Sequence, residues 1–324
     1  MNLVPGTAAP RAGNFPVLEG YIPMRYAGTL LEKARDNCIL PKLVNRDYEG
    51  DLRSHGDTLT IRKTPDIQAF DYRIGTPIEY QAVNVDAIEW AIRRCTIAPF
   101  KVNKIQERLS DINGFVSTWS SEAAKSLAEV KERKFFKDVP SRSHAKNQGN
   151  NAGLISESYD LGSVANPLKI VKAGAVEANH EANAPDAITY ANAALQEQPG
   201  GIGDDAYIVI PPVFAQRIQT SEMKDASLTG DAVTLLRKDV IATGVLSNFT
   251  VYVSNFCPMS MVAGKRQWTC LFGDRRGITY ADQISSIELK QDPYVAEQWN
   301  HSTLEIYDWF VVRPYRIGAM VITI

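Results

Sequence analysis

Alternating hydrophobic and polar positions predict a long two-stranded arm between about Tyr48 and Val102. The outgoing strand, Thr58-Leu59-Thr60-Ile61-Arg62, alternates with the period of two that is typical of a β-strand. The return strand repeats this alternation through Ile78, Tyr80, Ala82, Ile88, Trp90 and Ile92. The segment 65–77 contains proline, glycine and aspartate and forms the expected tip.

An arm of this kind has no hydrophobic core of its own. A two-stranded ribbon alone is marginally stable in water, so its apolar residues need cover from another surface. A neighbouring copy of the chain is the simplest cover, which predicts an assembly subunit. The expected contacts with that copy are Phe70, Tyr72, Tyr80 and Trp90. For Trp90, the alternative is packing on the helix of its own subunit.

Helical periodicity predicts one helix on each side of the arm. The first extends from Met24 to about Leu43 and follows Pro23. The second extends from Lys104 to about Lys137, a length of about 50 Å at the usual helical rise. Its narrow apolar seam consists of Ile105, Leu109, Ile112, Val116, Trp119, Ala123, Leu127 and Val130. Because this seam is short for a coiled coil, a helix laid across a β-sheet is favoured.

The rest of the chain predicts a central α/β region followed by strands. The polar stretch from Ser141 to Ser156 predicts a flexible loop. The periodicity then predicts a helix at 185–195 that ends before Pro199-Gly200-Gly201, a buried strand at 207–210, a helical segment to Gln219, a helix at 235–242 and a strand at 249–253. Closing strands are expected at 268–272, 284–290, 302–313 and 317–323. Prolines and glycines in the first 20 residues favour an extended N-terminal arm.

The balance of charges limits what the chain is expected to bind. Its 324 residues include 35 basic and 37 acidic side chains, which disfavours a surface that grips nucleic acid by neutralising phosphates. A container for polyanionic cargo is compatible with the net charge of −2. With 44% hydrophobic residues the chain can bury a core, and its length suits two modest domains.

The sequence predicts no catalytic, metal or cofactor site. The four histidines are isolated, and the four cysteines lack metal-ligand spacing. Gly264-Lys265 fails as a phosphate-binding loop, because Arg266 replaces the hydroxyl residue that would hold magnesium. The glycine-rich turn at 200–205 precedes a strand instead of joining a strand to a helix. Neither a signal peptide nor a membrane-spanning apolar run is found, so a cytoplasmic product is expected.

The expected elements follow one another in the order N-terminal arm, short helix, hairpin, long helix, α/β region and closing strands. Four short segments within this order support a resemblance to a known family. They are Tyr48-Glu49-Gly50 with Gly56-Asp57-Thr58, then Tyr207-Ile208-Val209-Ile210-Pro211-Pro212, then Phe249-Thr250-Val251-Tyr252-Val253-Ser254-Asn255, and finally Val311-Val312-Arg313-Pro314. In this order the chain resembles the major capsid proteins of tailed bacteriophages, the HK97-fold family. The likeness covers nearly the whole chain and includes no catalytic motif.

The resemblance implies an α+β, HK97-like capsid fold. Its expected parts are an N-terminal arm with a short helix at 1–47, an E-loop hairpin at 48–102, a P-domain with the spine helix at 103–184, an A-domain at 185–264 and closing P-domain strands at 265–324. The implied function is structural and not enzymatic: pentamers and hexamers build an icosahedral shell around the double-stranded DNA genome of a phage.

The resemblance also implies partners and a location. A separate scaffolding protein is expected because the arm begins at Met1, together with a portal protein and decoration proteins. Packaged DNA would be contacted weakly and without sequence specificity, and no cofactor, metal or membrane is implied. The protein would assemble in the host cytoplasm and reside in the virion.

Three alternatives remain open at this point. An encapsulin-like shell of a cellular compartment shares the fold, but the first 20 residues favour an external arm over a lumen-facing helix. An α/β enzyme with a site built from distant residues leaves no local motif to exclude. Another virion part, such as a decoration or minor capsid protein, seldom needs the arm, hairpin and long helix together.

Overall fold

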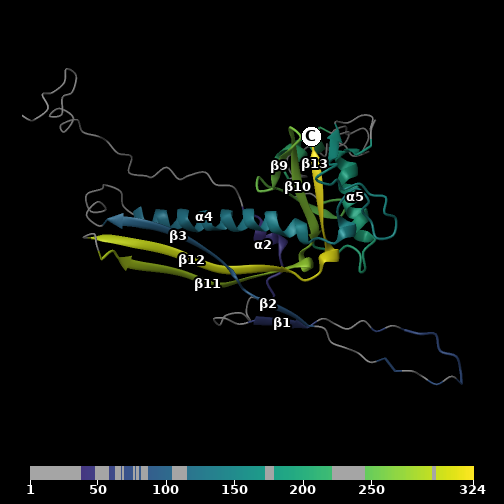
Figure 1. Ribbon diagram of the computed structural model, residues 1–324, viewed down its shortest axis with the longest axis horizontal. Helices are drawn as coiled ribbons and strands as arrows, with labels where there is room; N and C mark the ends of the chain where they lie inside the picture. Colours follow the sequence, from purple (N-terminus) through teal and green to yellow (C-terminus); the bar gives the residue numbers. More distant parts are fainter. Residues whose placement is uncertain are drawn as a thin grey trace, which may run out of the picture.

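The computed structural model describes residues 38–47, 58–62, 67, 69–75, 77, 80–81, 87–103, 115–171, 179–220, 245–293 and 297–324. These residues form an α+β fold with an elongated part, a compact part and a two-stranded arm (Figure 1). The elongated and compact parts meet at the C-terminal end of the long helix, α4 (Figure 1).

The elongated part is a three-stranded antiparallel sheet with α4 along it (Figure 1). The strand order is β11-β12-β3, with β3 at Arg94–Asn103, β11 at Ile278–Gln291 and β12 at Gln298–Val311. The helix α4 spans Phe115–Asp138, and Trp119 meets Phe100 of β3 edge-on at 5.9 Å between ring centroids. The predicted arrangement of a long helix across a sheet is therefore confirmed, while its predicted start at Lys104 lies outside the described residues.

The compact part is an eight-stranded mixed sheet with the order β5-β4-β13-β10-β6-β8-β7, and β9 pairs with β10 at its side. Its strands are β4 Leu168–Val171, β5 Glu181–Asn183, β6 Ala206–Ile210, β7 Val245–Leu246, β8 Phe249–Val253, β9 Met259–Val262, β10 Lys265–Asp274 and β13 Ile317–Thr323. Two helices accompany them, α5 at Ala184–Gln196 and α6 at Pro212–Gln219. The predicted helix at 235–242 lies outside the described residues.

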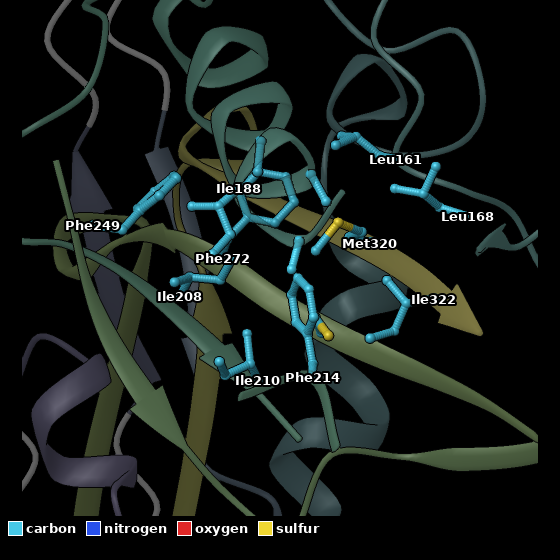
Figure 2. Close-up of a cluster of buried hydrophobic side chains, with 14 of the residues drawn as sticks. Leu161, Leu168, Ile188, Ile208, Ile210, Phe214, Phe249, Phe272, Met320 and Ile322 are labelled. Atoms are coloured by element: carbon cyan, nitrogen blue, oxygen red, sulfur yellow. The ribbon is translucent and has the colours of Figure 1, made fainter. Parts of the chain in front are cut away.

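Helix α5 shows how local sequence builds the core of the compact part. Asn183 is extended, and Pro185 stands in the first turn, where its missing N–H is not needed. Along one face the helix buries alanines with Ile188, and the small side chains allow close approach to the sheet. Ile188 lies beside Phe272 and Met320 of the sheet (Figure 2). The predicted helix and the predicted buried strand β6 are thus both confirmed.

A second core joins the compact and elongated parts. Phe135 and Phe136, near the C-terminal end of α4, are buried against both sheets. The same cluster contains Tyr207, Val209, Leu271 and Ile317 from the compact sheet and Ile278, Tyr280, Tyr307 and Trp309 from the long sheet. Phe135 contacts Trp309 edge-on at 5.6 Å between ring centroids. The two parts therefore share one continuous hydrophobic contact.

The sheet order divides the closing strands between the two parts. The strands β11 and β12 lie in the long sheet with β3, whereas β10 and β13 lie in the compact sheet beside β6. Residues before 185 also contribute to the compact sheet, through β4 and β5. Each of the two sheets therefore combines strands from distant parts of the chain.

The predicted flexible loop at Ser141–Ser156 is wrong in its first part. Two 3-10 turns, η2 at Val139–Arg142 and η3 at Ala145–Asn147, place the Asn147 side chain in the interior. Its amide nitrogen donates to the backbone oxygens of Tyr315 and Ile317, at 2.8 and 3.0 Å, and its oxygen accepts from Gln198 at 2.8 Å. A polar residue is buried here because every hydrogen-bonding group of its amide has a partner.

Candidate assembly surfaces

The root of the arm is a short antiparallel ribbon. The strand β1, Thr58–Arg62, pairs with β2, Ala87–Ala91, in the register Thr58 to Ala91. The predicted pairing of outgoing and return strands is confirmed. Ile61 and Trp90 pack together with Ala281 of β11. The root of the arm therefore has cover from its own subunit.

Trp90 illustrates this cover. Its side chain is only 3% exposed, and its ring centroid lies 6.4 Å from that of Phe310 on β12. The expected contact of Trp90 with a neighbouring copy is therefore corrected: the residue packs within its own subunit. The alternative that it packs on the long helix is also corrected, since the described partners belong to β11 and β12.

The tip of the arm has no such cover among the described residues. Five large hydrophobic side chains there are 62% to 99% exposed: Ile67, Phe70, Tyr72, Ile74 and Tyr80. The expected contact residues Phe70, Tyr72 and Tyr80 are thus available on the surface of the subunit. Ile67 and Ile74 were missed, although they stand in the same tip segment of the sequence. Exposed hydrophobic clusters of this kind mark interaction surfaces.

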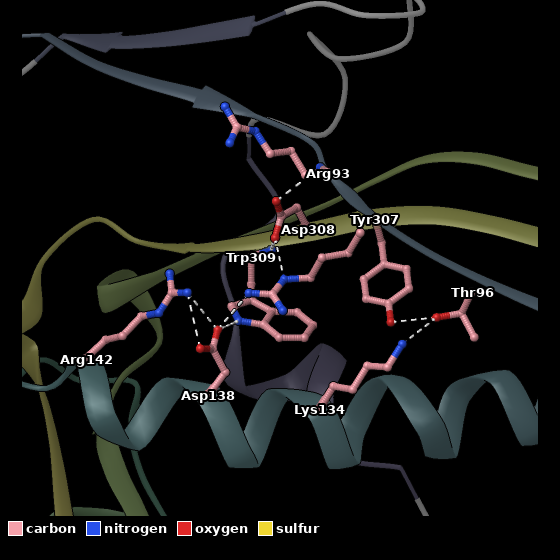
Figure 3. A network of polar contacts seen from close by, with 9 residues as sticks. Arg93, Thr96, Lys134, Asp138, Arg142, Tyr307, Asp308 and Trp309 are labelled. Carbon is pink, nitrogen blue, oxygen red and sulfur yellow. Dashed lines mark hydrogen bonds and ion pairs between the residues drawn. The ribbon is translucent and has the colours of Figure 1, made fainter.

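A polar network fixes the place where the arm leaves the body (Figure 3). At the start of β3, the Arg94 guanidinium donates to Asp308 of β12 and to Asp138 at the end of α4, each at 2.8 Å. The Trp309 indole N–H also donates to Asp138 at 2.8 Å, and the Arg94 guanidinium lies 4.1 Å from the Trp309 ring centroid. One arginine therefore connects three elements.

The electrostatics of this network have a clear cause. Asp138 ends α4, where the partial negative charge of the helix C-terminus disfavours a carboxylate. Arg94 and Arg142 supply the compensating positive charge, with Arg142 at 3.0 Å from Asp138. Only Ile92 and Arg93 separate β2 from β3, and the Arg93 N–H donates to Asp308. The network therefore orients the arm relative to α4.

A second group of contacts holds the chain that enters from the N-terminal side. The Glu132 carboxylate of α4 is fully buried and accepts hydrogen bonds from the N–H groups of Ile39 and Leu40, at 2.8 and 3.4 Å. These N–H groups begin the short helix α2, Leu40–Leu43, which has no side-chain cap of its own. Burial and the nearby Glu132 raise the pKa of the Cys38 thiol to about 12. Of the predicted helix at 24–43, only this end lies in the described residues.

The same N-terminal segment then joins the edge of the long sheet. Asn45 forms a parallel bridge with Thr279 of β11, through hydrogen bonds of 2.9 Å from its N–H to Ile278 and from the Tyr280 N–H to its oxygen. The Arg275 side chain donates to the Val44 oxygen at 2.9 Å. We call residues 38–47 the N-terminal strap. Its contacts come from segments distant in sequence, so local patterns could not reveal them.

The described residues contain no cluster of side chains suited to metal binding. No group of three or more histidine, cysteine or acidic side chains in the described ranges could hold a metal ion. Burial raises the pKa of the Cys257 thiol to about 12 and that of Cys270 well above its ordinary value, which disfavours the reactive thiolate. Among the described helices, none has the length and apolar character needed to cross a bilayer.

Comparison with solved structures defines the class of fold as that of phage capsid subunits. A structure from Mycobacterium phage Che8 superposes with a TM-score of 0.63 at 19% identity, covering 93% of this chain and 97% of that one. The capsid of cyanophage P-SCSP1u gives a TM-score of 0.62 at 13% identity and covers 100% and 98% of the two chains.

The capsid of a native GTA particle is similar over 99% of both chains, with a TM-score of 0.60 and 16% identity. No protein-family model and no curated protein sequence matches the chain. The resemblance to capsid proteins that the sequence suggested is thus confirmed by structure, at the level of the fold. In these three comparisons the similarity covers 93% or more of this chain and 97% or more of the compared chain.

Proposed function

We propose that this protein is the structural major capsid protein of a bacteriophage. Pentamers and hexamers of the chain would build an icosahedral shell around a double-stranded DNA genome, and the subunit would perform no enzymatic reaction. The observation that carries the proposal is the structural similarity to phage capsid subunits, which covers at least 93% of this chain and at least 97% of each of these two structures.

The surface of the subunit supports this role. A monomer gains nothing from exposing large hydrophobic residues on an arm that projects from the body (Figure 1), whereas a shell covers them with the next copy. In this proposal the arm is the E-loop, α4 is the spine helix, the long sheet is the P-domain and the compact part is the A-domain. Repetition around closed symmetry then multiplies contacts that are individually modest.

The proposed partners follow from the same role. A separate scaffolding protein, a portal protein and decoration proteins would complete the particle, which assembles in the host cytoplasm. The nearly balanced charge of the chain, −2 in total, suits weak and non-specific contact with packaged DNA. Tight phosphate binding would oppose release of the genome.

Electron microscopy of the purified chain tests the proposal, with and without a candidate scaffolding protein from the same locus. We expect uniform shells tens of nanometres across or rings of five and six subunits. A compact monomer under both conditions would refute the proposal. Neighbouring genes separate the virus from the encapsulin-like alternative: terminase, portal and protease genes accompany a capsid protein, whereas a cargo enzyme accompanies a compartment shell.

A further inference from the structure

A row of polar side chains crosses four neighbouring strands of the compact sheet. The register pairs Gln267 of β10 with Thr323 of β13. It also pairs Thr323 with Lys169 of β4, and Lys169 with Glu181 of β5. Because residues paired across adjacent strands point to the same face of a sheet, these four side chains share one face. The row lies at the end of the compact part that carries the C-terminus (Figure 1).

The four side chains line a cavity of about 320 Å³. Its remaining lining includes residues 165–167, His180 and the tip of the β9–β10 hairpin at 262–263. A hydrogen bond of 2.5 Å between the His180 ring and Asp160 joins the start of β5 to the loop that precedes β4. The volume is at the lower end of the range of small-molecule sites. The cavity is therefore built on paired strands and a hydrogen-bonded loop, which favours a preformed site.

Gln267 leaves one hydrogen-bond acceptor without a partner in the lining of this cavity. The residue is only 3% exposed, and its Nε2 donates to the Val164 oxygen at 3.3 Å, which fixes the orientation of the amide. Its Oε1 is buried and has no hydrogen-bond partner among the described residues. Since buried polar groups in proteins nearly always have a partner, this oxygen indicates a donor that belongs to a bound molecule.

The charges around the cavity favour an anion. Glu181 is the acidic side chain in the lining, and the Lys169 ammonium lies 2.5 Å from its carboxylate and compensates its charge. Lys265 also lines the cavity, is exposed and forms no ion pair with other described residues. One positive charge thus remains uncompensated, and it attracts an anionic ligand.

The ligand must therefore combine a negative charge with a hydrogen-bond donor. Hydrogen phosphate does so, because it keeps one O–H group at neutral pH. Sulfate has the same tetrahedral shape and the same charge but carries no proton. The phosphodiester groups of DNA carry no proton either.

We propose that this cavity binds inorganic phosphate. The phosphate O–H donates to Gln267 Oε1, and the other phosphate oxygens accept from the Lys265 ammonium. Bound phosphate would connect the β9–β10 hairpin with the end of β13, and it would stabilise the folded subunit by mass action. The inference goes beyond the proposed function and does not depend on it, since the site lies within one subunit.

Calorimetric titration of the purified subunit with phosphate and with sulfate tests the site, at neutral pH and equal ionic strength. A buried acceptor that faces sulfate receives no hydrogen bond, so we expect phosphate to bind about tenfold more tightly than sulfate. Equal affinities for the two anions would overturn the inference. Absence of binding by either anion would also overturn it and would mean that the cavity holds water alone.

Two variants separate the roles of the acceptor and the charge. Gln267→Met removes the acceptor and keeps the length of the side chain, so its affinities for phosphate and sulfate should become equal. Lys265→Ala should weaken the binding of both anions by similar factors, because its charge does not distinguish them. A phosphate preference that survives in Gln267→Met would contradict the proposed hydrogen bond.

The matched control is Arg266→Ala, which removes an exposed positive charge from the residue next to Lys265 that does not line this cavity. Its phosphate affinity should stay within about twofold of the parent, because an exposed charge outside the site is screened. A loss equal to that of Lys265→Ala would show that general positive potential attracts the anion and would overturn the inference. Circular dichroism verifies folding, and if Gln267→Met does not fold, the comparison of these two variants still tests the site.

A short DNA duplex separates the two sources of phosphate groups. Because its diesters carry no proton for Gln267, the duplex should not displace inorganic phosphate from the subunit. Displacement at an equal concentration of phosphate groups would show that the site recognises negative charge alone, and it would overturn the proposed selectivity.

Discussion

Replacing Glu132 with alanine should release the N-terminal strap from the body of the subunit. In the structure, the buried carboxylate accepts hydrogen bonds from the N–H groups of Ile39 and Leu40, at 2.8 and 3.4 Å. The short helix that these groups begin has no side-chain cap of its own, so α4 supplies the missing acceptor. Alanine removes that acceptor, so both N–H groups stay buried and lose their hydrogen bonds to the carboxylate.

The expected size of the effect follows from this geometry. A buried hydrogen-bonding group without a partner costs about 1–3 kcal/mol, and the longer bond to Leu40 belongs at the lower end of that range. Removing a buried carboxylate offsets part of the loss, because the desolvation penalty of the charge disappears. We therefore expect Glu132→Ala to lower the free energy of attachment of the strap by about 2–4 kcal/mol. Glu132→Gln should lose about half as much, since its amide oxygen still accepts from Ile39.

Hydrogen exchange on the unassembled subunit measures this effect where it occurs. Amide protection at Ile39, Leu40 and Tyr280 should fall, because these groups bond within or to the strap. Protection in α5 and β4 should stay unchanged, as the buried side chains of both belong to a separate core. Lys137→Ala, an exposed position on the same helix, serves as the control and should change nothing.

Two results would contradict this reasoning. If Glu132→Ala left protection at Ile39 and Leu40 within experimental error of the parent, the carboxylate would not hold the strap. If protection instead fell equally in α5 and β4, Glu132 would stabilise the whole subunit, and the strap would not be a separately releasable segment.

Three further predictions follow from the junction, the arm and the buried thiols. Asp138→Asn removes the charge that Arg94 contacts and should destabilise the subunit by about 1–2 kcal/mol in chemical denaturation, a value limited by partial exposure of the pair. Trp90→Ala should lower stability by about 3 kcal/mol, whereas Tyr80→Ala should leave stability within about 0.5 kcal/mol of the parent and reduce assembly instead. Burial raises the pKa of Cys257 from 9.0 to about 12, so its contribution to stability is present below pH 9 and is lost as pH rises toward 12, which denaturation at several pH values with Cys257→Ala as reference would detect.

Sequence patterns predicted the elements that depend on local chemistry. The strand pair of the arm, helix α5 and strand β6 follow from periodicity and from the positions of proline and glycine, and all three are present. The order of the strands within each sheet could not be predicted from these patterns. In the compact sheet, β10 lies between β6 and β13, which come from segments that precede and follow it by tens of residues.

The prediction for Trp90 failed for a related reason. Alternation on the return strand identifies which side chains share a face, but it does not tell whether the same subunit or another covers that face. Tyr80 and Trp90 have the same parity in the sequence, yet one is 91% exposed and the other 3%. The difference arises because β11 and β12 lie under the root of the arm and not under its tip.

This difference along the arm also bears on the symmetry of the proposed shell. Cover from the subunit itself ends at the cluster of Ile61 and Trp90, and the network around Arg94 orients the arm so that its tip points away from the long sheet (Figures 1 and 3). In the proposed shell, the body of the next copy covers the tip, so the two surfaces in contact are different patches and the proposed contact is heterologous. A two-fold dimer would instead require one self-complementary patch. Heterologous contacts close into rings when the rotation per subunit divides a full turn, and the arm is therefore better suited to holding capsomer rings together than to pairing subunits two by two.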